Sequence, residues 1–188
     1  METSEATVSG TIFLHAKEWD LTKFGSEEKL NEALKSAPEI LRQMHQHATV
    51  YPISRYPAAV YAAQYEFVIK QWGPEAFREA AAFCAQRDLS TIMKLFMRIG
   101  SPYYIAKRFP HSWSHYFNRG KFTILELTPK SLQGALEGTE VYGPGSCEGT
   151  YGWSRMALEY SGAKNLKIEH PECLFKGQPR CLFNYQWD

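Results

Sequence analysis

The chain ends in HPECLFKGQPRCLFNYQWD (residues 170–188), and this stretch decides most of what the sequence predicts about the fold. It places Cys173 and Cys181 on the two sides of a Gly-Gln-Pro-Arg turn, with His170 three residues before the first cysteine. Apolar residues alternate with polar ones in NLKIEH (165–170) and CLFNYQW (181–187), which is the period of a β-strand. The two segments therefore predict an antiparallel hairpin that brings both cysteines and the histidine to one end.

A third cysteine, Cys147, begins a predicted helix over 147–161, where the helix dipole favours a thiolate. Together with the hairpin residues it completes a set of three cysteines and one histidine, the kind of set that holds a tetrahedral metal ion: Cys147, His170, Cys173 and Cys181. Two other interpretations stay open from spacing alone, namely buried free thiols and a disulfide. Glu169 or Glu172 could also replace His170 as the fourth ligand.

The rest of the sequence predicts helices first and strands afterwards, which is an α+β plan. Residues 10–16 suggest a short strand or an ordered arm. Helical patterns follow over 26–48 (divided by Pro38), from Pro57 to Trp72, from Pro74 onward and from Leu89 to about 100. The segment 121–127 predicts a strand, and a second one is expected near 139–142. We therefore expect an N-terminal helical part followed by an antiparallel sheet with one packed helix and the C-terminal hairpin.

Length and composition describe one domain with a large aromatic content. The 188 residues are 44% hydrophobic and 14% aromatic, and the net charge is only +1. This charge gives no electrostatic footprint for direct nucleic-acid binding. No stretch approaches the roughly 20 apolar residues of a membrane span, and the acidic start is unlike a signal peptide. We therefore expect a cytoplasmic protein, where cysteines stay reduced and clustered thiols favour metal binding over disulfides.

The segment 101–122 is the densest aromatic region and is the predicted ligand pocket. Its candidate ligand-binding residues are Tyr103, His111, Trp113, His115, Tyr116 and Phe117. The alternative is that these aromatic side chains only pack a helix onto the sheet. Haem would need a histidine in an apolar helix, and His111 and His115 are flanked by Pro110 and serines, which disfavours it.

No motif of a known catalytic class occurs in the chain, so we expect a protein that is not an enzyme and has no catalytic residues. Two further residue types have ordinary interpretations. His45 and His47 are predicted at an exposed helix end, where cations complement the dipole. Cys84 lies on an apolar helical stripe and is predicted to be part of the core.

The spacing Cys147-x22-His170-Pro-Glu-Cys173-x7-Cys181 resembles the 4-vinyl-reductase domain family, which includes the sensor domains of phenol- and xylene-responsive bacterial activators. The stretch GW…ALEYSGAKNLKIEHPECLFKGQPRCLFNYQW is the most recognisable part. Where those sensors have a glutamate three residues before the first hairpin cysteine, this chain has His170. The wider superfamily also includes the transport-protein-particle (TRAPP) subunits and is linked to haem nitric-oxide-binding domains.

The resemblance implies a structural Zn2+ that pins the hairpin to the helix, a zinc-stapled hairpin held by Cys147, His170, Cys173 and Cys181. It implies one ligand-binding domain over 1–188, with an arm and helices over 1–48 as a candidate dimerisation segment. The implied function is a sensor or regulatory domain that binds a small hydrophobic molecule in an apolar pocket, as a homodimer. Two alternatives remain: an assembly module of the TRAPP type, and an enzyme related to tetrapyrrole vinyl reductases.

Overall fold

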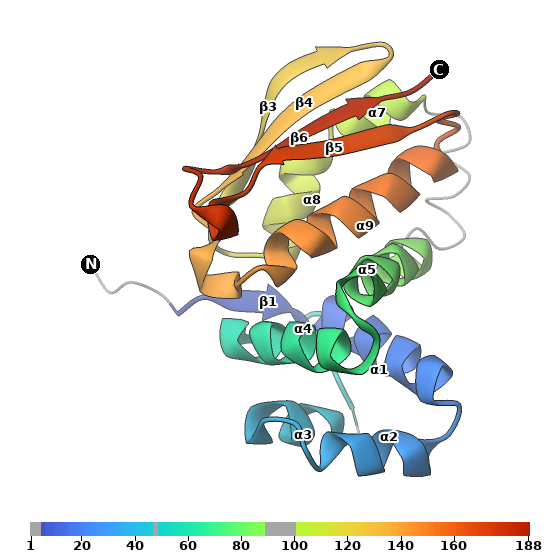
Figure 1. Cartoon of the computed structure of the whole chain (residues 1–188), viewed down its shortest axis with the longest axis vertical. Coiled ribbons are helices and arrows are strands. Elements are labelled where there is room, and N and C mark those ends of the chain that lie inside the picture. Colours follow the sequence, from blue (N-terminus) through green and yellow to red (C-terminus); the bar gives the residue numbers. More distant parts are fainter. Residues whose placement is uncertain (1–4, 47–48, 89–100) are drawn as a thin grey trace.

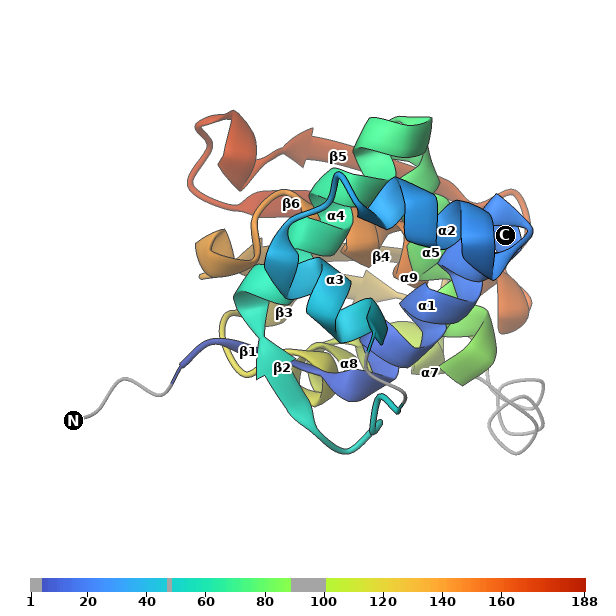
Figure 2. The ribbon, with the colours of Figure 1, turned by 90° about the horizontal axis from the view of Figure 1, so that it is seen from below.

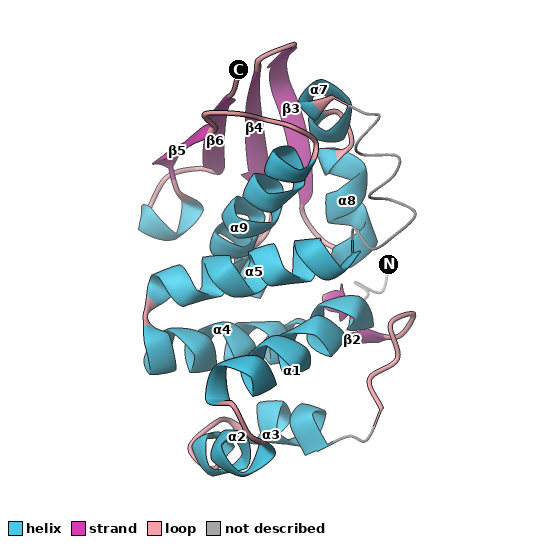
Figure 3. Cartoon of the chain, turned by 90° about the vertical axis from the view of Figure 1, so that its right-hand side faces the viewer, coloured by secondary structure: helices cyan, strands magenta, loops and turns pink. Residues whose placement is uncertain are grey.

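The computed structural model describes residues 5–46, 49–88 and 101–188. It confirms the α+β class, with the helical part first and a four-stranded antiparallel sheet afterwards. The elements are stacked in layers: the sheet, then helices α8 and α9, then α5, then α1 with α4, and finally α2 with α3 (Figures 1 and 3). The helix predicted from Leu89 to about 100, and His47, lie outside the described residues.

The N-terminal part consists of β1 (Thr7–Ser9), α1 (Gly10–Phe24), α2 (Glu27–Leu34), α3 (Glu39–Gln46), β2 (Arg55–Pro57) and α4 (Ala58–Trp72). Seen from the α2 and α3 end, these two short helices lie across α1 and α4 (Figure 2). The strand or arm expected at 10–16 is wrong, because Ser9 caps a helix there by accepting a hydrogen bond from the Thr11 N–H. The division of 26–48 near Pro38 is confirmed, since α2 and α3 are separate helices.

Helices α5 (Pro74–Asp88) and α9 (Gly145–Tyr160) are in close contact and join the helical part to the sheet part. Gly152 makes this approach possible. A Cβ atom on Gly152 would lie 2.1 Å from the backbone oxygen of Arg78 on α5, which is far inside van der Waals contact. The position of α5 on α9 therefore depends on the absence of a side chain at this residue.

The sheet has the strand order β3-β4-β6-β5, and every neighbouring pair is antiparallel. Its strands are β3 (Lys121–Thr128), β4 (Ser131–Glu137), β5 (Lys167–Glu172) and β6 (Cys181–Gln186). The predicted C-terminal hairpin is confirmed, and β6 lies inside the sheet next to β4. The strand expected near 139–142 is wrong: Glu140–Tyr142 forms one 3-10 turn, and the partner of β3 is β4, directly after the turn at residues 129–130.

Two short helices, α7 (Pro102–Ala106) and α8 (Phe109–Tyr116), carry the aromatic segment and lie beside α9 under the sheet (Figure 3). Trp113 and Phe117 stack on each other with ring centroids 4.1 Å apart, and both are buried. In the described part of the chain, no helix combines the length and the apolar character that crossing a bilayer requires. Homodimerisation through 1–48 stays a prediction.

Candidate ligand cavity and Cys/His cluster

A cavity of about 90 Å3 lies where the helical part meets the sheet part. Side chains of α1, α4, α5, α8, β3 and α9 line it. Its walls are largely aromatic, including Tyr61, Phe77, Phe109, Trp113, Phe117 and Trp153. Small residues on α5 leave the space between these rings, namely Ala80, Ala81 and Cys84. The cavity is therefore apolar and enclosed by elements from both halves of the molecule.

Asp88, the last residue of α5, is the acidic side chain in the described lining of the cavity. The hydroxyl of Tyr116 donates a hydrogen bond of 2.5 Å to Asp88 Oδ2. His15 Nε2 lies 2.9 Å from Asp88 Oδ1. Burial, followed by the charge of Asp88, raises the pKa of both Tyr116 and Cys84, so both side chains remain neutral.

Only some of the predicted pocket residues line the cavity. Trp113, Tyr116 and Phe117 line the cavity. His111 and His115 are exposed on the other side of α8, and partly buried Tyr103 is not among the lining residues. Sequence reasoning missed the contribution of α5, which lines the cavity with Ala80, Ala81 and Cys84; Cys84 was interpreted as core. Small residues in an otherwise bulky apolar stripe were the signal that could have revealed a gap.

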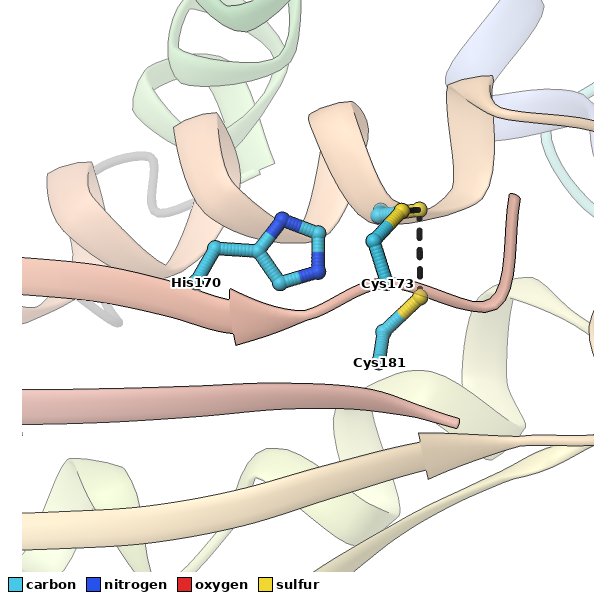
Figure 4. Close-up of side chains that lie close together, drawn as sticks. His170, Cys173 and Cys181 are labelled. Carbon is cyan, nitrogen blue, oxygen red and sulfur yellow. Dashed lines mark hydrogen bonds between the residues drawn. The ribbon is translucent and has the colours of Figure 1, made fainter. Parts of the chain in front are cut away.

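The four predicted metal ligands do lie together at one end of the sheet. The ligand atoms of Cys147, His170, Cys173 and Cys181 are all within 4.8 Å of one another. Cys147 Sγ lies 3.3 Å from Cys181 Sγ and 3.9 Å from Cys173 Sγ. Figure 4 shows the histidine and the hairpin sulfurs converging on one point beside α9. That these side chains bind a metal ion stays a prediction.

Local irregularity in β5 allows this convergence. The register between β5 and β6 shifts between Glu169 and Glu172, around His170 and Pro171. The imidazole of His170 then stacks on Phe183 with centroids 4.3 Å apart, and its Nε2 is buried without a hydrogen bond of normal geometry. Glu172 instead pairs with Arg180 at 3.1 Å, and Glu169 is exposed. Neither glutamate therefore competes with His170 for the cluster.

The electrostatics of the cluster favour one thiolate. The side-chain hydrogen bond with Cys147 lowers the pKa of Cys181 to about 5, and the neighbouring His170 adds to this shift. The backbone N–H of Leu174 also donates to Cys181 Sγ, at 3.4 Å. The pKa of Cys147 is raised because its proton is shared with Cys181 and because it is buried. The thiolate of Cys181 is the form that a metal ion would bind.

The interpretation of His45 as an exposed helix end is wrong. Its side chain is 3% exposed, and its Nε2 lies 3.3 Å from Oδ2 of Asp20, a fully buried carboxylate on α1. Gln64 Nε2 donates to the same Asp20 oxygen at 2.8 Å. The packing of α3 on α1 and α4 therefore buries a polar group that the local sequence places at a helix terminus. Cys84 is buried, as predicted.

Comparison with known proteins identifies the fold. No protein-family model matches the sequence, and no curated protein matches it either. Solved structures of H-NOX domains do match. An H-NOX protein from S. oneidensis in the Fe(II)NO ligation state has a TM-score of 0.72 and 12% identity, covering 96% of this chain and 99% of its own. An oxygen-binding H-NOX domain related to soluble guanylate cyclases has a TM-score of 0.67 and 11% identity, covering 96% and 95%.

These findings contradict two expectations from the sequence. The chain is not shown to be a member of the 4-vinyl-reductase family, because no family model matches and the matched structures are H-NOX domains. Zinc as the cofactor is contradicted as well. Two H-NOX structures from S. oneidensis are described in Fe(II) ligation states. One further neighbour, with a TM-score of 0.64 and 10% identity over 95% of this chain and 99% of its own, is described through its haem redox potential. At these identities the comparison shows the fold alone.

The residues around the cavity do not fit haem. Haem iron is held by His, Met, a Cys thiolate or Tyr. Within the described ranges, the lining contains no histidine or methionine, and no lysine or arginine to pair with the propionates. Tyr61, Cys84 and Tyr116 are present, but burial raises the pKa of each and disfavours its anionic form. The cavity is also smaller than the roughly 150 Å3 space that holds one benzene in an engineered protein.

Proposed function

We propose that this chain is a small-molecule sensor domain with the H-NOX fold that works without haem. Its ligand is a small, largely apolar molecule no larger than a single ring. One observation carries the proposal: an apolar cavity of about 90 Å3 occupies the junction of the two halves, and its described lining offers neither an axial histidine nor a cationic side chain. Apolar, partly aromatic enclosures with a few polar groups are typical of ligand sites.

The location of the cavity supports signalling by occupancy. Its walls come from α1 and α5 on one side and from α8 and α9 on the other, so a ligand would contact both halves at once. A ligand that binds one arrangement of α5 against α9 better than another shifts the population toward it. That the chain is not an enzyme, and that it is cytoplasmic, stay predictions.

The test uses furan, an apolar ring of suitable size, and haem as the competing ligand. We expect furan to shift the NMR signals of cavity residues saturably, and we expect added hemin to give no shifted Soret band. Ala80→Leu fills the cavity and should abolish furan binding. Ala82→Leu on the same helix does not touch the cavity and should leave furan binding unchanged. Stoichiometric haem binding, or no furan response at all, would contradict the proposal.

We also propose that the Cys/His cluster holds a tetrahedrally coordinated metal ion with a structural role. A metal–sulfur distance of about 2.3 Å places the sulfurs of a tetrahedral site about 3.8 Å apart. The two sulfur–sulfur distances of 3.3 and 3.9 Å are close to this value. Four protein ligands leave no position for a substrate, so such an ion would stabilise the hairpin on α9 and take no part in ligand sensing.

Neither alternative from the sequence gains support. An assembly module of the TRAPP type predicts a solid core, whereas this core contains a cavity. A tetrapyrrole reductase would have to accept a macrocycle, which the cavity is too small to hold.

A further inference from the structure

Among the described residues, the lining of the cavity contains hydrogen-bond acceptors and no lysine or arginine. Asp88 is the only acid among the described lining residues, and its side chain is 12% exposed. Its two oxygens already contact His15 and Tyr116, at 2.9 and 2.5 Å. A carboxylate has about four lone-pair positions, so the two contacts with described residues occupy only part of its acceptor capacity.

Another lining residue of the cavity, Gln64, carries a second buried acceptor. Gln64 lines the cavity, and its Nε2 is fixed toward the carboxylate of Asp20 at 2.8 Å, which settles the orientation of the amide. Its Oε1 is consequently buried and has no hydrogen-bond partner in the described part of the chain. A buried carbonyl without a donor costs free energy.

The charge of Asp88 acts on the cavity itself. It contributes, after burial, to raising the pKa of Cys84 and Tyr116, two other lining residues. The carboxylate would repel an anionic ligand at close range, and the described lining contains no lysine or arginine that would attract one. The site therefore distinguishes ligands by their charge and by whether they donate or accept a hydrogen bond.

We propose that Asp88, held by His15 and Tyr116, makes this cavity selective for small apolar ligands that carry an N–H or O–H donor. Neutral acceptor-only molecules of the same shape bind more weakly, and carboxylates are excluded. This inference rests on the proposed function, since it assigns a ligand class to the same cavity. Asp88 acts here as the residue that determines specificity.

Pyrrole and furan provide the test, since the two rings are nearly the same size and differ by an N–H donor in place of an acceptor oxygen. We expect the folded wild-type chain to bind pyrrole at least about tenfold more tightly than furan, the gain expected from one hydrogen bond to a charged acceptor. Affinities come from NMR titrations of cavity signals. Asp88→Asn keeps the shape of the side chain and should reduce the ratio to about one. Glu79→Gln removes an exposed carboxylate from the same helix and should leave the ratio unchanged.

The outcomes separate the two proposals. If furan and pyrrole bind equally well to the wild type, the cavity binds ligands but the role of Asp88 is wrong. If neither ring binds, the proposed function itself fails. If Asp88→Asn does not fold, the wild-type ratio decides alone, supported by N-methylpyrrole, which lacks the donor and should bind no better than furan. An unchanged ratio in a folded Asp88→Asn protein would overturn the inference.

Discussion

Two polar clusters described above, the Cys/His cluster and the cluster around Asp88, differ in how the chain assembles them. The Cys/His cluster takes its four members from α9 and the β5–β6 hairpin, all within residues 147–181. The Asp88 cluster takes His15 from α1, Asp88 from α5 and Tyr116 from α8. The first is close in sequence and is recognisable from spacing. The second exists only because α1, α5 and α8 meet in three dimensions, and no spacing in the sequence indicates it.

We expect the largest loss of stability from a substitution that breaks the Cys/His cluster. Cys181→Ser should lower the free energy of unfolding by several kcal/mol if a metal ion is bound, because metal binding and folding are coupled. Cys84→Ser, at a buried cysteine outside the cluster, should cost about 1–3 kcal/mol. Urea unfolding measures both.

Co2+ added to the metal-free protein gives an independent readout, since three thiolates should produce strong sulfur-to-metal absorbance that Cys181→Ser weakens. A chelator should lower the wild-type stability toward that of Cys181→Ser. Equal, mild effects of the two serine variants, with no Co2+ absorbance, would leave the cluster as ordinary buried thiols.

The same difference explains which parts of the fold could be predicted from the sequence. The order of the elements, the division near Pro38 and the C-terminal hairpin follow from local periodicity and breakers, and the structure confirms them. The errors occur where distant contacts decide. Residues 10–16 belong to α1, whose packing on α5 is a contact between segments far apart in the sequence. His45 is buried because α3 brings it to Asp20.

The candidate site shows the same division. Trp113, Tyr116 and Phe117 could be predicted from aromatic density, whereas Asp88 could not, because it ends an amphipathic helix where an acid ordinarily faces water. His111 and His115 looked suitable by residue type but lie on the exposed side of α8. Their direction depends on which face of α8 packs against the sheet, and a helix of eight residues leaves that choice to tertiary contacts.

The second prediction breaks the helix crossing that joins the two clusters. Gly152→Ala places a Cβ atom 2.1 Å from the Arg78 backbone oxygen, so α5 must move away from α9. We expect a loss of about 3 kcal/mol, at the upper end of overpacking costs. Arg155→Ala on the exposed face of α9 should cost far less. If Gly152→Ala is as stable as the wild type, α5 and α9 do not pack as closely at Gly152 as described.

The third prediction breaks the Asp88 cluster without touching the crossing. Asp88→Ala removes the acceptor for Tyr116 and His15 and leaves a buried hydroxyl and an imidazole nitrogen without this partner. We expect a loss of about 2 kcal/mol in thermal or urea unfolding. The control Glu79→Ala, at an exposed ion pair with Lys23, should change stability by less than about 1 kcal/mol. Similar values for both variants would mean that Asp88 contributes no more than a surface charge.

The smallest effect at neutral pH concerns two buried tyrosines, one in the Asp88 cluster and one on β6, the strand that carries Cys181. Burial raises the pKa of Tyr116 at the cavity and of Tyr185 in the sheet. An unfolded tyrosine releases its proton near pH 10, whereas these folded ones do not, so the unfolded state binds fewer protons above that pH. Their contribution to stability is therefore fully present below about pH 10 and is lost as the pH rises further. Tyr185→Phe, which loses only the hydroxyl contact with Ser154, should raise the pH of alkaline unfolding. Fluorescence and tyrosinate absorbance would follow this transition, and an unchanged midpoint in both Tyr185→Phe and Tyr116→Phe would show that other groups set the alkaline limit.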